Sequence, residues 1–288
     1  MKKIAFVTYA GLKRLSEDDR LAIPALQARG VEVEATVWND PLVEWSRYAA
    51  IVLRSTWDYS DHFEEFSNWL DCMEAARVPL WNPVGVVRSN LRKDYLKDLS
   101  AGGIAIPETV WLGDRWPSDL TATLWHLGWK QAVAKPRIGH SAKGVFLVRE
   151  DGSLRTPDGR AMTGPLPPAK DYFLQEYLAE IGSSGEWSLV FLEGEFSHAV
   201  LKRPHVRDFR VQEEHGGSQE AAVPPQWLLD QACVVDLIPN PWLYARVDGV
   251  IRDGQFMVME LELVEPALFF KYDAGAPMRF ADAVLQRI

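Results

Sequence analysis

The sequence predicts a protein of the α/β and α+β classes, with a parallel α/β unit at the N-terminus and a mainly antiparallel sheet with helices at the C-terminus. Three observations support this fold class. The chain has 288 residues, 47% hydrophobic and 25% charged, which is ordinary for one to three compact units. Residues 3–8 and 31–37 are strand-like runs that flank a helix pattern. The dipeptides Glu193-Gly194 and Asp253-Gly254 each separate two strand-like runs, as in β-hairpins.

The N-terminal unit begins with a β-α-β pattern. Ser16 and Asp19 can start a helix that ends near Gly30. Residues 49–54 form a short apolar run and indicate a third, buried strand. A second helix follows, with Ser60 or Asp61 as its N-cap and apolar residues at helical spacing, namely Phe63, Phe66, Trp69, Leu70 and Met73. The carboxyl ends of such parallel strands are where ligands bind.

The rest of the chain predicts two further units, so that the three units span residues 1–85, 86–170 and 171–288. The central α+β unit has a helix around 91–100 that ends at Gly102-Gly103, followed by a strand, a helix and two strands at 108–111, 120–127, 131–136 and 144–149. The C-terminal unit holds the two hairpins, with strands at 186–192, 195–202, 244–252 and 255–264 and helices near 225–237 and 277–287.

Charge and cysteine content exclude several classes of function. The chain carries 31 basic and 40 acidic side chains, a formal charge of −9, so its surface would repel nucleic acids and anionic membranes. Cys72 and Cys233 lie in no disulfide or zinc spacing. No apolar run approaches the roughly 18 residues of a membrane span. We therefore expect a cytoplasmic protein that binds neither nucleic acid nor membrane; a homodimer stays open.

Two carboxylates, Glu260 and Glu262, stand on one face of the expected strand 255–264. Strand alternation places them about 7 Å apart, on the same face as Phe256 and Val258. Unpaired carboxylates on an apolar face are unfavourable, so we expect a divalent cation or an arginine beside them. Oxygen ligands favour Mg²⁺, Ca²⁺ or Mn²⁺ over Zn²⁺. The alternative is a solvated sheet face.

Asp248, in the neighbouring strand, completes the cluster in only one hairpin register. A two-residue loop at Asp253-Gly254 would point Asp248 away from Glu260. A three-residue loop that includes Gln255, with a glycine bulge, would place Asp248 and Glu260 on the same face. We predict the bulged form.

Four basic residues lie where an anion such as a phosphate could bind. In the bulged register Arg246 faces the carboxylates, either as a cation of the site or in an ordinary structural ion pair. Lys135 and Lys202 end strands, and Lys93 stands at a helix start. The loop 137–144 is basic and bounded by glycines, which suits main-chain contacts with phosphate oxygens, although many surface loops share this composition.

Several familiar signatures are missing from the sequence. It has neither the P-loop pattern Gly-x-x-x-x-Gly-Lys-Ser/Thr nor the dinucleotide pattern Gly-x-Gly-x-x-Gly after the first strand. It also lacks the nucleophile elbow Gly-x-Ser-x-Gly and the zinc helix His-Glu-x-x-His. The sequence therefore gives no support to a P-loop nucleotidase, a dinucleotide-binding enzyme, a serine hydrolase or a zinc protease.

Short motifs follow one another along the chain: Asn82-Pro83, Lys93-Asp94-Tyr95-Leu96, Gly103 to Thr109, Val133-Ala134-Lys135-Pro136, Gln175-Glu176-Tyr177-Leu178, Gly185-Glu186-Trp187-Ser188, Tyr244 to Asp248 and Glu260 to Pro266. Each motif is loose, but their order and spacing resemble those of the ATP-grasp superfamily of carboxylate–amine ligases, especially its glutathione-synthetase-like members. The resemblance covers nearly the whole chain. It implies the ATP-grasp fold and ATP as a substrate.

The resemblance assigns nucleotide-binding roles to residues of this chain. Lys93 and Lys135 match lysines that contact the ATP phosphates. The glycine-rich flap over the phosphates matches the loop that contains Gly139, Ser141 and Gly144. The remaining matches are an adenine-binding hinge at Gln175, Glu176, Tyr177 and Leu178, a ribose-binding acid at Glu186, and a large closing loop at His215, Gly216 and Gly217.

The resemblance also implies Mg²⁺ as a cofactor, with two ions expected. Asp248, Glu260 and Glu262 fall on the metal-ligand positions of the family. Arg246 matches the arginine that stabilises the transferred phosphoryl group. Lys202 and Arg210 resemble basic residues near that group and the substrate.

Glu262 departs from the usual family pattern, which has asparagine at this position in a Glu-x-Asn motif, and Glu265 is a second unusual carboxylate. Glutamates at these two positions resemble the sequence pattern of the subgroup that contains D-cycloserine synthetase. Three other segments point to the same subgroup: Arg54-Ser55-Thr56-Trp57-Asp58-Tyr59, Phe196 to Val200 and Asp208-Phe209-Arg210.

The implied function is an ATP- and Mg²⁺-dependent carbon–nitrogen ligase. It would phosphorylate a carboxylate or ureido oxygen of a small amino-acid-like substrate, form a C–N bond or close a ring, and release ADP and phosphate. Arg54 and Trp57, at the end of the third strand, are candidates for binding the amino-acid end of the substrate, although packing alone would also account for Trp57. The alternative is a catalytically silent nucleotide-binding protein with the same fold; a kinase-like phosphotransferase is a weaker one.

Overall fold

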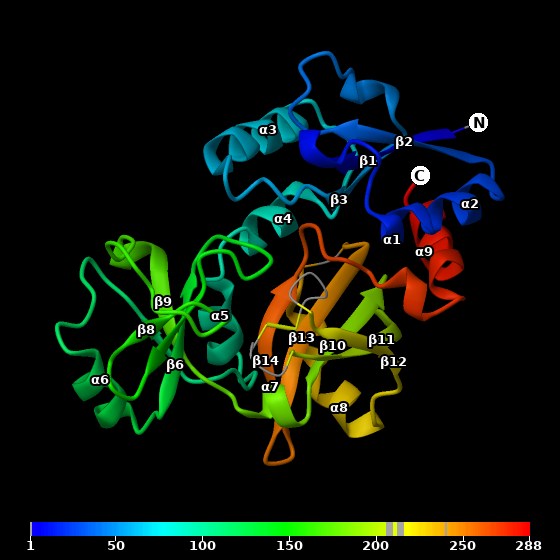
Figure 1. Ribbon diagram of the computed structural model, residues 1–288. Coiled ribbons are helices and arrows are strands. Elements are labelled where there is room, and N and C mark those ends of the chain that lie inside the picture. The colour runs from blue at the N-terminus through cyan, green and yellow to red at the C-terminus, as the bar shows by residue number, and fades with distance from the viewer. Residues whose placement is uncertain (1, 206–209, 212–215, 240) are drawn as a thin grey trace.

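The computed structural model describes residues 2–205, 210–211, 216–239 and 241–288, and these residues form three β-sheets. In Figure 1 the N-terminal sheet (blue) lies above the C-terminal sheet (yellow to orange), and the middle sheet (green) lies to the left. One sheet is parallel and two are antiparallel, which confirms the predicted fold class.

The N-terminal sheet is parallel and has the strand order β2-β1-β3-β4. Its strands are β1 (Lys2–Thr8), β2 (Val31–Val37), β3 (Ala50–Ser55) and β4 (Leu80–Trp81). The crossovers are α1 (Glu17–Arg20) with α2 (Ala22–Gln27), and α3 (Phe63–Ala75). As predicted, α1 begins after Ser16, whose hydroxyl accepts a hydrogen bond of 3.0 Å from the main-chain N–H of Asp19.

The cap of α3 differs from the expectation of Ser60 or Asp61. The N-cap is His62, and its side chain makes no hydrogen bond to the helix. The residues before the helix form consecutive turns, in which the N–H of Asp61 donates to the carbonyl of Asp58 at 2.9 Å. The carboxylate of Asp61 is paired with Lys143 at 2.6 Å, so it is directed away from the helix end.

The middle sheet is antiparallel and has the order β5-β9-β6-β7-β8. Its strands are β5 (Thr109–Trp111), β6 (Gln131–Pro136), β7 (Phe146–Arg149), β8 (Leu154–Arg155) and β9 (Tyr172–Glu176), and α6 (Leu120–Leu127) packs beside them. The strand β9 pairs with β5 and β6 and so belongs to the middle sheet. This pairing favours a boundary between the second and third units after Glu176 rather than after residue 170. The division into three units stays a prediction.

Two short helices replace the single helix expected over residues 91–100. They are α4 (Val84–Asn90) and α5 (Tyr95–Ala101). Between them the main-chain N–H of Lys93 donates to the carbonyl of Arg137 at 2.7 Å, a contact that interrupts the helical ladder. This break places the main chain of Lys93 beside Arg137, the residue that follows β6 of the middle sheet.

The C-terminal sheet is antiparallel and has the order β12-β11-β10-β13-β14. Its strands are β10 (Glu186–Leu192), β11 (Glu195–Arg203), β12 (Ser218–Ala222), β13 (Tyr244–Arg252) and β14 (Gln255–Glu262). The helices are α7 (Glu180–Ser183), α8 (Gln226–Gln231) and α9 (Ala276–Leu285). Short 3-10 helices occupy Ala10–Leu12, Trp45–Arg47, Ala169–Asp171, Cys233–Leu237 and Phe270–Tyr272.

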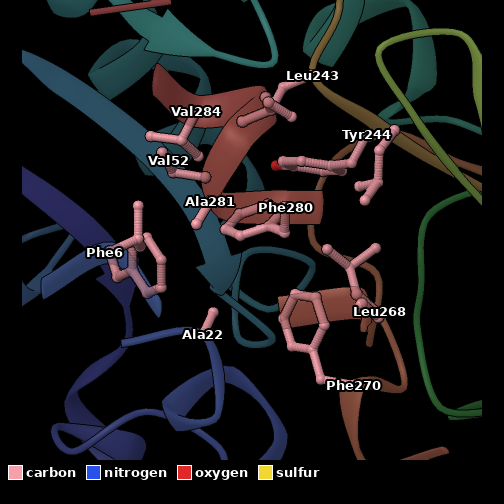
Figure 2. Close-up of a cluster of buried hydrophobic side chains, with 14 of the residues drawn as sticks. Phe6, Ala22, Val52, Leu243, Tyr244, Leu268, Phe270, Phe280, Ala281 and Val284 are labelled. Carbon is pink, nitrogen blue, oxygen red and sulfur yellow. The ribbon is translucent and has the colours of Figure 1, made fainter. Parts of the chain in front are cut away.

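A shared core joins the first and last parts of the chain. Figure 2 shows Phe6 and Val52 of the N-terminal sheet near Phe280 and Val284 of α9, with Tyr244 of β13 nearby; all five belong to one buried cluster. The helix α9 packs against α2, β10 and β11, and the ring of its Phe280 lies 6.1 Å from the ring of Phe6 in β1; Figure 1 places both chain ends in this region. This core fixes the N-terminal unit against the hairpin that carries the candidate metal ligands.

In the part of the chain that the structure describes, no helix is both long enough and apolar enough to span a bilayer.

Candidate active site

The β13–β14 hairpin brings three carboxylates and one guanidinium together. Asp248 pairs opposite Glu260, and Arg246 pairs opposite Glu262. All four side chains therefore lie on one face of the ribbon, as the bulged register predicts.

The bulge itself lies elsewhere than expected. The loop is the two-residue turn Asp253-Gly254, whose φ angles of 51° and 76° suit a hairpin of this kind, rather than a three-residue loop that includes Gln255. The register shifts between Asp248 and Gly249, so that Met259 is the extra residue. The strands approach closely there, because a Cβ on Gly249 would lie 2.5 Å from the carbonyl of Met257.

The three carboxylates fit a hard divalent cation. Asp248, Glu260 and Glu262 each offer an oxygen, and these atoms lie within 4.8 Å of one another. Asp248 is 3% exposed, whereas the two glutamates are half-buried and open onto a cavity. Oxygen donors at this spacing suit Mg²⁺ or Mn²⁺.

Arg246 is tied to two of these carboxylates. Its Nη2 lies 2.8 Å from Asp248 and also donates to Glu262, while its Nη1 donates to the carbonyl of Ala267 at 3.1 Å. The two neighbouring carboxylates raise the pKa of Arg246 above its ordinary value despite burial, so the residue is a permanent cation.

Asp248 is the most strongly held member of the cluster. Ser188 donates to it at 2.5 Å, and Lys202 lies 3.5 Å away. Although burial opposes ionisation, Arg246 and Lys202 hold the pKa of Asp248 well below its usual range. The pKa of Glu262 is raised, because burial and the charge of Asp248 outweigh the attraction of Arg246.

Each of the three lysines around the cluster has a side-chain partner. Lys202 lies 2.5 Å from Glu186, its cross-strand neighbour, and Lys93 pairs with Glu260. Lys135 donates to the side-chain oxygen of Gln175 at 2.7 Å. Burial and the nearby charge of Lys93 lower the pKa of Lys135 to about 8, and burial also lowers the pKa of Lys93.

One cavity of ≈ 490 Å³ connects these groups. Its lining includes most of the predicted site residues, namely Trp57, Lys93, Lys135, Gly139, Ser141, Glu186, Lys202, Arg210, Arg246, Asp248, Glu260 and Glu262. Because they come from all three sheets and the loops between them, the cavity lies where the three units meet.

The same architecture recurs in known proteins. Residues 4–82 match the family described as D-cycloserine synthetase DcsG, N-terminal domain. Over 304 aligned residues the chain is 32% identical to the cycloserine biosynthesis protein DcsG of Streptomyces lavendulae, with 99% of this chain and 98% of that protein covered. The chain belongs to the DcsG family of ATP-grasp ligases.

Solved structures agree with this assignment. The crystal structure of D-cycloserine synthetase DcsG matches with a TM-score of 0.77 and 26% identity, covering 99% of both chains. D-alanine–D-alanine ligase of Bacillus anthracis, complexed with ATP, shares the fold with a TM-score of 0.63 and 18% identity, covering 100% of this chain and 97% of that one. The predicted ATP-grasp fold and the class of ATP-dependent carbon–nitrogen ligase are confirmed.

Several residues assigned from the resemblance lie outside the cavity lining of this ATP-grasp ligase. These are Arg54, Gly144, the hinge residues Gln175, Glu176, Tyr177 and Leu178, and the glycines Gly216 and Gly217. Gln175 is 1% exposed, and its side chain binds Lys135 and Thr109, so it contacts Lys135, a predicted phosphate-binding residue, from within the sheet. Asp208, Phe209 and His215 lie outside the described residues.

Arg54 is placed differently from a substrate-binding residue. It is fully buried, pairs with Asp19 at 2.9 Å and donates to the carbonyl of Pro266 at 2.8 Å. Its guanidinium also lies 5.0 Å from the ring centre of Tyr244. These contacts occupy its donors inside the core and favour a structural role, while the predicted binding of the substrate by Arg54 stays a prediction.

The sequence reasoning missed two polar residues of the site. Ser188 holds Asp248, and the alternation of β10 from Glu186 gives a signal that it shares the cavity face. Asp18 lines the cavity from α1, and one of its oxygens, Oδ2, is buried without a hydrogen-bond partner. Its position depends on packing between the first and last parts of the chain, which local patterns do not contain.

Proposed function

We propose that this ligase uses ATP and Mg²⁺ to phosphorylate a carboxylate or ureido oxygen of a small amino-acid-like substrate and then forms a C–N bond, or closes a ring. The observation that carries the proposal is the single cavity in which three clustered carboxylates face Lys93, Lys135, Lys202 and Arg246. A triphosphate needs cations on several sides, and a divalent ion needs clustered oxygens.

Asp248, Glu260 and Glu262 would hold the metal, and two ions remain part of the proposal. Bound Mg²⁺ would supply charge neutralisation along the phosphates. In the ligand-free state the same carboxylates hold Lys93, Lys202 and Arg246. Nucleotide binding would exchange these ion pairs, since the carboxylates take the metal and the cations take phosphate oxygens.

Four cations would stabilise the negative charge that moves to the departing nucleotide. A substrate oxygen attacks the γ-phosphorus, and the bond to ADP breaks. An amine nitrogen of the substrate then attacks the activated carbon and loses a proton, and phosphate leaves. Arg246 beside Asp248 and Lys202 beside Glu186 already lie in the cavity, so on nucleotide binding they would only exchange a carboxylate partner for a phosphate oxygen.

The remaining nucleotide roles are proposed from the resemblance and from position. Glu186 lines the cavity at the start of β10, where it could receive the ribose once Lys202 turns to phosphate. Gly139 and Ser141 line the cavity together with Lys135, and their loop, which also contains Gly144, would act as a flap that excludes water from the activated intermediate. The proposed adenine hinge at residues 175–178 begins in the last two residues of β9, the strand that pairs with β6.

The test is Mg²⁺-ATP turnover against a panel of amino acids and O-ureido-serine, with phosphate release and product mass as readouts. The proposal expects substrate-dependent ADP and phosphate with a condensed or cyclised product. Lys202→Met is the matched inactive control, because it removes a cation from the cavity without changing a metal ligand. Tight ATP binding without phosphate release under any condition would instead support a catalytically silent nucleotide-binding protein.

A further inference from the structure

The segment Glu265 to Leu268, directly after the metal-binding strand, is held by an unusual series of contacts. Four successive carbonyls each accept a hydrogen bond from a side chain distant in the sequence. The donors, in carbonyl order from 265 to 268, are Trp57 at 3.2 Å, Arg54 at 2.8 Å, Arg246 at 3.1 Å and, through Nε2, His198 at 2.8 Å. Such a segment is rigid before any ligand binds.

This rigid segment presents the carboxylate of Glu265 to the cavity. Glu265 is 8% exposed and lines the cavity wall, three residues after the predicted metal ligand Glu262. Among the described residues it makes no ion pair; its own main-chain N–H supports the carboxylate, and the charges of Lys93 and Arg246 attract it without forming an ion pair. Burial and the charge of Glu262 raise the pKa of Glu265 to about 8.

Three cations of the site are already paired with other carboxylates. Lys93 pairs with Glu260, Lys202 with Glu186, and Arg246 with Asp248. A carboxylate buried without a partner is costly, and a site keeps one when a ligand supplies the missing charge. Glu265 is therefore matched to a positive group that arrives with the substrate.

Asp18 gives a second, independent indication. It lines the same cavity from α1, and its Oδ1 is fixed by the main-chain N–H of Lys271 at 3.0 Å, while Oδ2 is buried and unpartnered. Two acids from opposite ends of the chain thus face one cavity with free acceptor capacity. Acceptors of this kind suit the three donors of an ammonium group.

We infer that Glu265 binds the ammonium group of the substrate, with Asp18 as a second acceptor in the same subsite. The inference rests on the proposed function, because it assigns the end of the substrate that is not phosphorylated. It makes a primary ammonium a required feature of the substrate. It also gives Trp57 and Arg54 a function, since both hold the main chain that positions Glu265.

The subsite is tested by ligands that differ only in this group. Serine carries an ammonium group where glycerate carries a hydroxyl group. Both enantiomers of each compound are tested. Their binding to the protein saturated with Mg²⁺-ADP is measured by calorimetry and by tryptophan fluorescence, which Trp57 can report from the cavity wall. We expect at least tenfold tighter binding of one serine enantiomer than of the matching glycerate.

Glu265→Gln should abolish this preference while leaving the affinity for Mg²⁺-ADP within twofold of wild type. Glu265→Asp should retain part of the preference for serine. Glu64→Gln, the same change at an exposed position of α3, should leave the preference intact. A purely structural Glu265 would lower the melting temperature instead, whereas we expect no decrease, because the variant removes an uncompensated buried carboxyl.

Two results would overturn the inference: serine preference that survives Glu265→Gln, or equal binding, including no binding, of serine and glycerate by the wild type. Neither result affects the proposed ligase function, which fails separately if the wild type does not bind Mg²⁺-ADP or Mg²⁺-ATP. Loss of metal binding by Glu265→Gln would assign this carboxylate to the metal and would likewise overturn the ammonium subsite.

Discussion

Asp248 and Glu262 belong to one cluster, yet replacing each by its amide should affect stability in opposite directions. Two oxygens of Asp248 lie 3.0 and 3.2 Å from Nε of Arg246, and Ser188 donates to it at 2.5 Å. The cations hold its pKa well below the ordinary value, so the ionised form stabilises the fold. Burial raises the pKa of Glu262, so its ionised form opposes folding.

Removing one partner of a buried ion pair costs about 3–5 kcal/mol. In Asp248→Asn the amide keeps the shape and one acceptor, and Arg246 retains Glu262, so we expect a loss at the low end, about 3 kcal/mol, in the free energy of unfolding at pH 7. Glu262→Gln should leave that free energy unchanged or raise it by about 1 kcal/mol. Ser188→Ala, which removes one hydrogen bond to a charged group, should cost about 2 kcal/mol.

Urea denaturation at pH 7 and at a series of lower pH values measures all four proteins. Because the pKa of Asp248 is lowered in the folded state, its contribution is complete above the ordinary aspartate pKa of about 4. The difference between wild type and Asp248→Asn should therefore shrink as the pH falls below that value. Equal stability of wild type and Asp248→Asn at pH 7, or an equal loss in both amide variants, would refute this electrostatic account.

Two other predictions concern the nucleotide site, and a third concerns an exposed ion pair. Since the pKa of Lys135 is about 8, its charged fraction falls about thirtyfold between pH 7 and pH 9.5, and Mg²⁺-ATP affinity should fall by up to that factor. Lys135→Met should bind weakly without this dependence; a pH-independent wild-type affinity would contradict the prediction. Gly144→Ala should raise the KM for ATP several-fold, because φ is +73° and the new Cβ would lie 2.9 Å from the Tyr172 hydroxyl; an unchanged KM would show that the flap tolerates the strain. Lys143→Gln breaks the exposed pair with Asp61 and should change the free energy of unfolding by less than about 1 kcal/mol, as thermal melts would show.

Regular alternation made much of this site predictable from the sequence. The spacing of Glu260 and Glu262 fixed their common face, and the hairpin dipeptide located the turn. The position of the bulge was not predictable, because the close approach of Gly249 to the main chain of Met257 depends on packing between strands. The local sequence pattern is equally consistent with a bulge at the turn and with a bulge within the strands.

The substrate end of the cavity depends on contacts that local patterns do not contain. Arg54 and Trp57 bind carbonyls more than 200 residues away in the sequence, with separations of 212 and 208 residues. Their chemistry in isolation predicts substrate binding, which stays a prediction, while their hydrogen bonds also support the segment of Glu265. The break between α4 and α5 has a similar origin, since the main-chain N–H of Lys93 donates to the carbonyl of Arg137, which directly follows β6.

The central claim is that the cluster of Asp248, Glu260 and Glu262 binds divalent cations that carry a triphosphate. Electron paramagnetic resonance of Mn²⁺, titrated with a non-hydrolysable ATP analogue, tests it most directly by counting bound ions. We expect two bound Mn²⁺ per chain when protein and analogue are both present, and at most one in Glu260→Gln. Binding no greater than that of the analogue alone, or unchanged by Glu260→Gln, would contradict the account.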